Sequence, residues 1–322
     1  MPSIAVGIAG LGQFGRNHLR VLQDLPGVEI AAVADTDRSR LDGLSFPAFT
    51  DARELIGRCS AAVVATPTLA HADVGCALLQ GGVDVLVEKP IAPDLTSADR
   101  LIRAAAANGR ILQVGHLERF NPGVRALRGA ATLPLFFEIH RMSVFTPRSL
   151  DVDVVLDLMI HDIDVLLSLT GDEPNEIRAA GIRILSEKVD IANVRLAFAN
   201  GCVANLTASR VSVEKIRKVR VFQPNEYISL DYARQDAARV TVRNGEAQFE
   251  SLPVTAAEPL RLQLESFLEC VRNRQRPEVS GEDGRKALAV CLEITDTIEA
   301  HGATVRRTLA EREATAGGES PS

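Results

Sequence analysis

"GIAGLGQFGRNHL", residues 7–19, decides the fold, because it joins an apolar strand to a helix through a glycine-rich turn. Gly10, Gly12 and Gly15 form a G-x-G-x-x-G pattern. The first glycine of such a turn permits the tight bend, the second lets a pyrophosphate approach the backbone, and the third lets the helix pack on the strand. The N–H groups and the dipole at the helix start then hold the phosphates. The pattern therefore predicts a dinucleotide site.

An acidic residue stands where such a site needs one, at the tip of the next apolar run. Asp35 lies 20 residues after Gly15 and ends the run 28–35. Its carboxylate would accept hydrogen bonds from the adenosine ribose and repel a 2′-phosphate. Asp37 adds negative charge, whereas Arg38 softens the discrimination. We therefore expect NAD rather than NADP.

The first third of the chain alternates short apolar runs with longer helical patterns. Strands are expected at residues 4–10, 28–35, 61–66, 84–90 and 110–116, and helices at 15–25, 69–82 and 95–109. Strands that are apolar along their whole length are typical of a sheet covered by helices on both faces. The repeated β-α-β units predict a Rossmann fold, a doubly wound parallel sheet.

From about residue 150 the pattern changes to one helix followed by a series of strand-like runs. Residues 193–200 and 202–210 alternate apolar and polar side chains and are joined by Asn200-Gly201, a strong hairpin signal. We expect a mostly antiparallel open sheet with helices on one face. The expected division is an NAD-binding domain at 1–122, an α+β substrate and oligomerisation domain at 123–308, and a flexible tail at 309–322.

Composition narrows the class of protein. The net charge of −6 disfavours nucleic acid as a partner, and the absence of Trp gives no support to a base-stacking surface. No apolar stretch approaches the roughly 20 residues that span a membrane. The five cysteines are scattered without zinc-ligand spacing, which favours reduced thiols and no metal site. Because the N-terminus has no basic leader, we expect a cytoplasmic protein.

"EKP", residues 88–90, ends an expected strand, and such strand ends point into the cofactor crevice of a doubly wound sheet. Pro90 biases Lys89 toward an extended backbone and stiffens its position. The residues alone leave two interpretations open, a lysine at the reacting centre and a surface lysine at a strand end.

"DLMIHDIDVLLSL", residues 157–169, is an apolar helix with four ionisable side chains. Asp157 and His161 are four residues apart and share one face; Asp164 returns near that face and Asp162 points elsewhere. Histidine is suited to accept a hydroxyl proton near neutral pH, and a nearby carboxylate orients the imidazole. The alternative is a core histidine among hydrogen-bonded acids.

Taken in order, these motifs resemble the Gfo/Idh/MocA oxidoreductase family over about residues 4–305. The matching stretches are the glycine turn, "ATPTLAH" at 65–71, "EKP" at 88–90, D-x-x-x-H-x-x-D at 157–164 and "RPEVSGEDGRKAL" at 276–288. The resemblance implies an NAD-dependent dehydrogenase acting on a sugar hydroxyl, in which Lys89, Asp157 and His161 are catalytic. From their positions on the helix, we expect Asp164 to be structural, bound to backbone or an arginine, and Asp162 to be a solvated or supporting acid.

The resemblance also implies a cofactor site and a substrate site. The expected cofactor-binding residues are Gly10, Gly12, Gln13, Phe14, Gly15, Asp35, Thr66, Pro67, His71, Glu88 and Lys89. A purely structural role for His71 stays open. The expected substrate-binding residues are Lys89, His116, Arg119, Asn121, Asp157 and His161.

Residues 114–122, 156–164 and 208–232 look most like the branch of the family that oxidises C3 of UDP-N-acetylglucosamine, ahead of transamination to a 3-amino sugar for lipid A. The candidate cations for its pyrophosphate are Arg119, Arg141, Arg148, Arg210 and Lys215. A charged strand face is the alternative for residues 214–220.

Two other functions stay open, a dehydrogenase of a free polyol such as inositol and a non-catalytic NAD-binding regulatory protein. The resemblance further implies a homodimer or homotetramer built on the open sheet face.

Overall fold

The computed structural model describes residues 3–146, 152–243 and 245–316. The chain divides into two compact units, each with its own sheet. The first unit comprises Met1–Arg125 and Thr255–Leu288, and the second comprises Ala126–Val254 and Ala289–Ser322.

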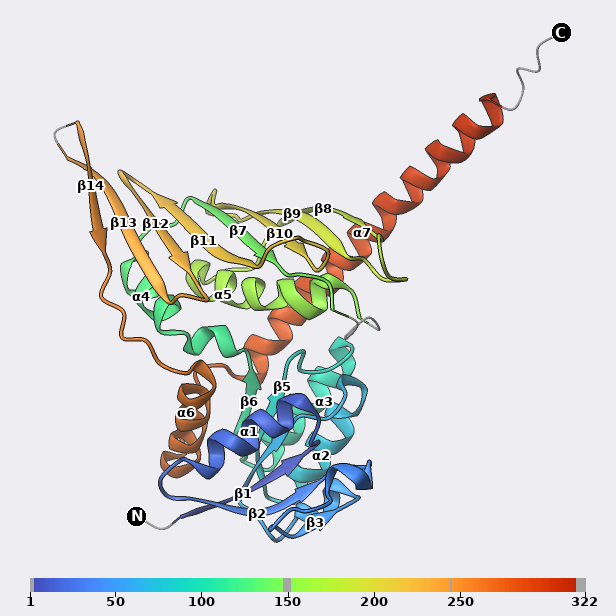
Figure 1. Ribbon diagram of the computed structural model, residues 1–322, viewed down its shortest axis with the longest axis vertical. Coiled ribbons are helices and arrows are strands. Elements are labelled where there is room, and N and C mark those ends of the chain that lie inside the picture. Colours follow the sequence, from blue (N-terminus) through green and yellow to red (C-terminus); the bar gives the residue numbers. More distant parts are fainter. Residues whose placement is uncertain (1–2, 147–151, 244, 317–322) are drawn as a thin grey trace. The chain divides into compact units, whose positions relative to one another are not determined.

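The first unit contains a six-stranded sheet in the order β3-β2-β1-β4-β5-β6, and every neighbouring pair is parallel. Its strands are β1 (Ile4–Ala9), β2 (Val28–Ala34), β3 (Ala48–Phe49), β4 (Ala61–Val64), β5 (Asp84–Glu88) and β6 (Leu112–Gly115), and its helices include α1 (Gln13–Gln23), α2 (His71–Gln80), α3 (Leu95–Ala107) and α6 (Pro259–Asn273). α1 packs beside α6, and α2 beside α3 (Figure 1). The expected doubly wound parallel sheet is confirmed, and the two-residue edge strand β3 is an addition.

The first unit is discontinuous in sequence because α6 completes its core. Leu264, Phe267 and Leu268 of α6 are buried with Leu19 and Leu22 of α1 in one hydrophobic cluster. Burying such side chains stabilises a fold by roughly 1.5–3 kcal/mol each. A single boundary at residue 122 therefore differs from the compact units, since a later segment returns to the first sheet.

The second unit contains an eight-stranded sheet in the order β14-β13-β12-β11-β7-β10-β9-β8. Its strands are β7 (Phe136–Met142), β8 (Glu176–Ile182), β9 (Ile191–Ala197), β10 (Val203–Ser209), β11 (Ile216–Gln223), β12 (Glu226–Asp231), β13 (Asp236–Arg243) and β14 (Glu246–Ser251). The pair β7–β10 is parallel and the other neighbours are antiparallel. The expected hairpin is confirmed, because Asn200 and Gly201 connect β9 to β10, and Gly201 has the positive φ of 84° that such a turn requires.

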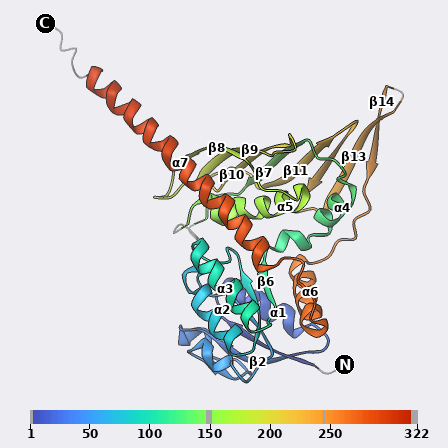
Figure 2. The same cartoon turned by 180° about the vertical axis from the view of Figure 1, so that it is seen from behind.

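One face of this sheet is packed, and the other is partly exposed, with polar side chains and an aromatic group of Phe136, Phe222 and Tyr227. In β9, Val194 and Leu196 are buried, whereas the alternate residue Arg195 is exposed and donates to Asn205 of β10 at 3.1 Å. Helix α5 (Ile160–Thr170) lies along one face of the sheet (Figure 2). This alternation is what an antiparallel sheet with one packed face produces.

Two helices remain, α4 (Pro122–Ala130) and the long α7 (Gly281–Ala316). α7 continues through residues 309–316, where a tail is expected from the sequence, because Ala, Leu, Glu and Arg there favour helix. Residues 317–322 lie outside the described residues.

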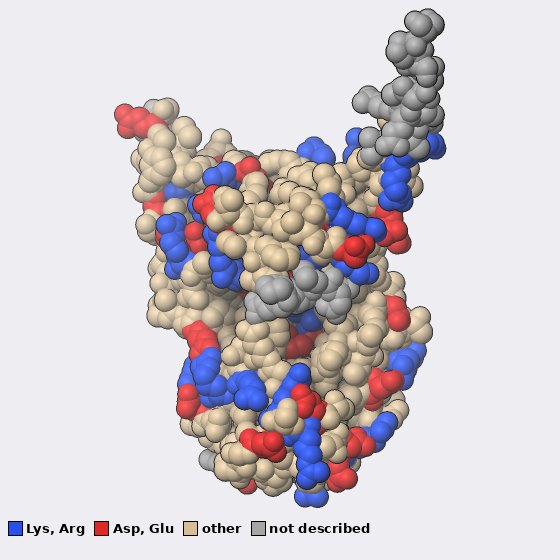
Figure 3. All heavy atoms as spheres, turned by 45° about the vertical axis from the view of Figure 1, so that its right-hand side comes forward, with Lys and Arg blue, Asp and Glu red and all other residues tan. Residues whose placement is uncertain are grey.

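In the described part of the chain, no helix combines the length and apolarity that crossing a membrane requires. On the face drawn in Figure 3, Lys and Arg are interspersed with Asp and Glu.

A histidine is fully buried at the carboxyl end of β6. His116 has no exposed surface, and neither ring nitrogen has a hydrogen-bond partner within the described residues. Burial lowers the pKa of His116 to about 3, and the positive charges of Arg119 and Lys89 act in the same direction. The imidazole is therefore held neutral, since charging it would place an unpaired cation in the core.

We expect this histidine to make the protein less stable as the pH falls from about 6.5 toward 5. In that window the unfolded chain binds a proton at His116 that the folded protein excludes, so the stability falls by up to about 1.4 kcal/mol per pH unit. Urea-unfolding midpoints of the wild type and His116→Gln at pH 7 and pH 5 measure this. The variant should lose about 1–2 kcal/mol less between the two pH values.

His301→Gln, at an exposed position of α7, is the matched control and should lose stability like the wild type. His116→Phe gives a second, non-titrating side chain for the case that glutamine is not tolerated in the core. Wild-type pH dependence in both His116 variants would contradict the expectation.

Candidate functional site

The glycine turn is built as its spacing requires. Gly10 has φ of +91°, and a Cβ there would lie 2.5 Å from the carbonyl oxygen of Ala65. A Cβ on Gly15 would lie 1.8 Å from the carbonyl oxygen of Gly10. At Gly12, by contrast, a Cβ would meet only the Nη1 of Arg40, at 3.8 Å. Packing thus demands Gly10 and Gly15, whereas the missing side chain of Gly12 leaves space beside the turn.

This space belongs to a cavity of about 820 Å³ in the first unit. The predicted cofactor residues that line it are Gly10, Gly12, Gln13, Phe14, Asp35, Thr66 and Pro67. Gly12 is the N-cap of α1 and brings no side chain to bond the first N–H groups of the helix. Phe14 is 58% exposed and lines the same cavity. The uncapped helix start fits a bound pyrophosphate.

Asp35 presents an oriented carboxylate to this cavity. Its Oδ2 accepts the N–H of Leu11 at 2.6 Å, and its Oδ1 accepts the N–H of Asp37 at 2.8 Å. Each carboxylate oxygen has two acceptor sites, so capacity remains for ribose hydroxyls. Arg40 lies 3.4 Å from Asp35 and 3.2 Å from Asp37, whereas no ion pair of Arg38 with either acid occurs among the described residues. The cation that partly neutralises Asp35 and Asp37 is therefore Arg40 rather than the expected Arg38.

His71 holds two loops of the cofactor unit together. Its Nδ1 lies 2.9 Å from the carbonyl oxygen of Pro90, and its Nε2 lies 2.9 Å from that of Thr66. Burial lowers its pKa, so the imidazole is neutral and donates to one of these carbonyls at a time. This arrangement supports the structural alternative, and direct contact with the cofactor stays a prediction.

β5 ends at Glu88, two residues before the expected strand end, and Lys89 follows it directly; the Lys89–Pro90 peptide bond is cis. Glu88 is largely buried, and its Oε1 lies 2.6 Å from Nε2 of His18 on α1. Burial acts to raise the pKa of Glu88, but the hydrogen bond and charge of His18, with Lys89, lower it overall. His18 was missed from the sequence, although it follows Gly15 by three residues and so lies on the same face of α1.

The side chains of Arg119 and Asn121, in the loop after β6, are buried and hydrogen-bonded. Arg119 is 8% exposed and donates to the carbonyl oxygen of Glu278 at 3.1 Å. Asn121 is 3% exposed, donates to Glu118 at 3.1 Å and accepts the N–H of Gly123 at 3.0 Å. Their bonds shape the start of α4, and contact of His116, Arg119 and Asn121 with substrate stays a prediction.

In the second unit, the helix with acids begins with an unexpected π-helical turn, Val155–Met159, which runs into α5. Asp157 lies in this turn and His161 in the first turn of α5, and both are half-buried. Asp162 and Asp164 are each 2% exposed. Asp157 and His161 are therefore partly accessible to solvent, whereas Asp162 and Asp164 are buried. π-helical turns are frequent at functional sites.

Asp162 anchors the helix. Of its two expected roles, the solvated acid is wrong because the side chain is buried, and the supporting acid stays open. Arg141 of β7 donates to it from Nε at 2.7 Å and from Nη2 at 2.8 Å. The guanidinium of Arg141 also lies 5.1 Å from the ring centroid of Tyr232. A bidentate pair of this kind is strong and directional, and it fixes α5 to the sheet.

The candidate pyrophosphate cations differ in their surroundings. Arg141 and Arg210 are 2% and 4% exposed and bind Asp162 and Asp190. The expectation that these two bind phosphate is therefore wrong, because each is enclosed with a carboxylate. Lys215 is exposed, and Arg148 lies outside the described residues.

Comparison with known proteins places this geometry in a family. Residues 4–116 match the model "Oxidoreductase family, NAD-binding Rossmann fold", and residues 124–224 match the "GFO/IDH/MocA C-terminal domain". UDP-N-acetylglucosamine 3-dehydrogenase of Acidithiobacillus ferrooxidans is 33% identical over 93% of this chain and 99% of its own. Its solved structure has a TM-score of 0.88 over the same shares of the two chains.

Two more distant relatives widen the comparison. Myo-inositol 2-dehydrogenase of Thermotoga maritima is 26% identical over 88% of this chain and 92% of its own. An oxidoreductase of Agrobacterium radiobacter, solved in complex with NAD⁺, L-tartaric acid and magnesium, shares the fold at 19% identity, with a TM-score of 0.82 over 92% of this chain and 96% of its own. With its glycine turn, its acid at the tip of β2 and its paired domains, the chain belongs to the Gfo/Idh/MocA family of NAD-binding oxidoreductases.

Proposed function

We propose that this chain oxidises a secondary hydroxyl of a sugar, and that its substrate is UDP-N-acetylglucosamine, converted at C3 to the 3-keto sugar. The observation that carries the proposal is the 33% identity, over nearly the whole of both chains, to a UDP-N-acetylglucosamine 3-dehydrogenase. NAD, when bound in the cavity of the first unit, supplies the hydride acceptor.

The proposed catalytic residues are Lys89, Asp157 and His161. Oxidation of an alcohol requires loss of the hydroxyl proton, and His161 is the side chain suited to accept it near neutral pH. Asp157, four residues earlier, orients the imidazole and stabilises its cation. Lys89, at the end of β5, assists by stabilising negative charge that develops on the hydroxyl oxygen.

A nucleotide sugar also needs a cation for its pyrophosphate. Lys215, which is exposed, meets this need better than the enclosed Arg141 and Arg210. A homodimer or homotetramer built on the open sheet face would use side chains such as Arg195, which already bonds across strands to Asn205. The five buried thiols are all free, which supports a reducing compartment such as the cytoplasm.

A free polyol is the second candidate substrate, because a myo-inositol 2-dehydrogenase is 26% identical over most of this chain. It requires no pyrophosphate contact, so the enclosure of Arg141 and Arg210 leaves it open.

Formation of NADH, followed by its ultraviolet absorbance with UDP-N-acetylglucosamine and with myo-inositol, separates the two substrates. We expect the kcat/KM for the nucleotide sugar to exceed that for inositol by at least about 100-fold, since the latter offers no pyrophosphate for binding. Turnover of inositol alone would reject the nucleotide sugar. Bound NAD without turnover of any sugar in a panel would instead favour the regulatory alternative.

Lys89→Ala and His161→Ala should each keep NAD affinity while losing most turnover. Removal of a positioned proton acceptor typically costs 10²–10⁴-fold in rate, so we expect losses of about that size. Steady-state kcat and fluorescence titration with NADH measure the two properties. His301→Ala, an exposed histidine of α7, should behave like the wild type. Wild-type rates in both Lys89→Ala and His161→Ala would show the mechanism to be wrong.

The preference for NAD should depend on the charge of Asp35. Asp35→Asn keeps the shape of the side chain but no longer repels a 2′-phosphate, and Arg40 beside it becomes available to pair with that phosphate. We expect the ratio of NADPH to NADH dissociation constants to fall by about 10-fold, or about 1.4 kcal/mol. Asp37→Asn, at an exposed position, should change the ratio less. Tighter binding of NADPH by the wild type would remove the role assigned to Asp35.

A further inference from the structure

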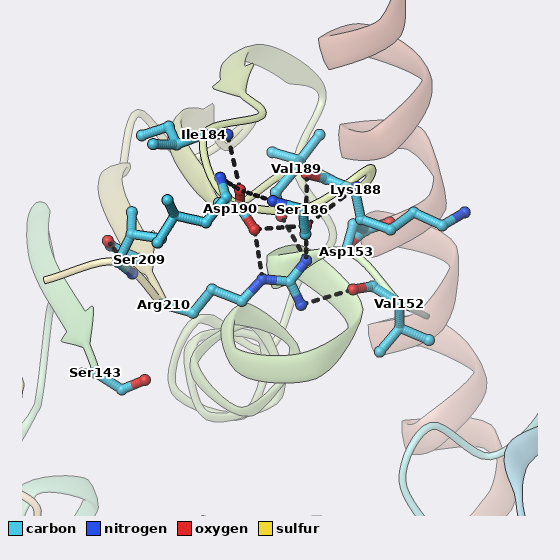
Figure 4. A network of polar contacts seen from close by, with 12 residues as sticks. Ser143, Val152, Asp153, Ile184, Ser186, Lys188, Val189, Asp190, Ser209 and Arg210 are labelled. Carbon is cyan, nitrogen blue, oxygen red and sulfur yellow. Dashed lines mark hydrogen bonds and ion pairs between the residues drawn. The ribbon is translucent and has the colours of Figure 1, made fainter. Parts of the chain in front are cut away.

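A buried carboxylate in the second unit gathers a loop around itself. Asp190 has no exposed surface. Its Oδ2 accepts the N–H groups of Ile184, Leu185 and Ser186 at 2.7, 2.6 and 3.0 Å, and its Oδ1 accepts the hydroxyl of Ser186 at 2.7 Å (Figure 4). Burial acts to raise the pKa of Asp190, but these bonds and Arg210 hold it well below its usual range. The loop between β8 and β9 is thus fixed around one negative charge.

Arg210, which follows β10, joins this loop to a different segment. Its Nε donates to Oδ1 of Asp190 at 2.8 Å, and its Nη2 donates to the hydroxyl of Ser186 at 3.1 Å and to the carbonyl oxygen of Val189 at 3.3 Å. Its Nη1 points the other way and donates to the carbonyl oxygen of Val152 at 2.8 Å (Figure 4). The guanidinium is planar with donors in a fixed fork, so it sets the distance between the two segments.

The segment that receives Nη1 leads directly into the helix with acids. Val154 donates its N–H to the carbonyl oxygen of Val189 at 3.0 Å, a second bond between the same loop and this entry. Asp153 then caps the π-helical turn, because its Oδ1 accepts the N–H groups of Val155 and Leu156, each at 2.9 Å. Asp157 follows within that turn. The position of the turn therefore depends on the loop that Asp190 and Arg210 hold.

We propose that Asp190 and Arg210 form a clamp that positions Asp157 and His161, so that Arg210 is a positioning residue of the reaction. The inference rests on the proposed function, in which these two side chains handle the hydroxyl proton. Reactions that depend on aligned groups lose about 100-fold in rate when a group is misplaced by about 1 Å. A buried ion pair is by itself weak evidence for a stabilising role. The hydrogen bond from Nη1 of Arg210 to the carbonyl oxygen of Val152 is therefore the observation that points to alignment of the helix.

Arg210→Lys tests the clamp, because lysine keeps the positive charge beside Asp190 but one ammonium group lacks the fork that also reaches Val152. We expect kcat for the sugar to fall about 10- to 100-fold with the dissociation constant of NADH unchanged. The pH profile of kcat/KM should shift, because His161 loses its alignment with Asp157. Hydrogen exchange in residues 152–160 should become faster.

Arg178→Lys is the matched control. Arg178 also pairs with a carboxylate of its own unit, Glu176 at 2.6 Å, but the pair is exposed and contributes little. It should leave kcat, the pH profile and the exchange rates as in the wild type.

The outcomes separate the clamp from the proposed function. Faster exchange at 152–160 with an unchanged kcat and pH profile, while His161→Ala is inactive, would overturn the clamp and leave the function standing. Unchanged exchange would also overturn the clamp. Full activity of His161→Ala would reject the proposed function, and the positioning role would fall with it. If Arg210→Lys does not fold, Ser186→Ala serves as the second variant, because it removes one hydrogen bond to Asp190 and one to Arg210. It should lower kcat severalfold and make exchange in residues 152–160 faster. Wild-type values of kcat and exchange in Ser186→Ala would overturn the clamp.

Discussion

Helix α1 lies against the turn at Gly10 with no room for a side chain at Gly15, and the cavity of the first unit depends on this packing. No side chain fits between Gly15 and the carbonyl oxygen of Gly10, where an added Cβ would lie 1.8 Å away. This contact sets where α1 begins and therefore where its first N–H groups point. In the same turn, the N–H of Leu11 donates to Oδ2 of Asp35 at 2.6 Å, so the turn also orients the carboxylate that is proposed to bind the ribose. Backbone geometry thus shapes the cavity of the first unit and orients the Asp35 side chain within it.

The second unit buries several ionisable side chains in and around a helix that packs on a sheet. Asp162 is neutralised by Arg141 with two hydrogen bonds, and Asp190 by Arg210 and four further donors. Buried charges require such pairing, because desolvation is otherwise too costly. Asp157 and His161 stay half-buried, which supports the proposal that they exchange a proton with the substrate.

Much of the fold follows from local patterns, and the exceptions have physical reasons. The glycine turn, the apolar strands and the Asn200-Gly201 hairpin are local signals, and the structure confirms each. The return of α6 to the first sheet is a long-range packing event that helix periodicity does not encode. The π-helical turn at Val155–Met159 arises from hydrogen-bond register, which residue types specify only weakly. The ion pairs of Arg141 and Arg210 join strands to segments distant in sequence, which the sequence does not reveal. The expected pyrophosphate binding therefore fell on two residues that the fold encloses.

The discontinuity of the first unit has a consequence for how the protein is made. A ribosome delivers the glycine turn, Asp35 and all six strands of the first sheet before it delivers α6. Until Leu264, Phe267 and Leu268 emerge, the apolar face of α1 that they cover is exposed to water and to other chains. Domains usually fold from the N-terminus as synthesis proceeds. Here the core of the NAD-binding unit is incomplete until the sheet of the second unit has been translated. The nascent chain therefore has an exposed apolar surface, accessible to chaperones, during most of its synthesis.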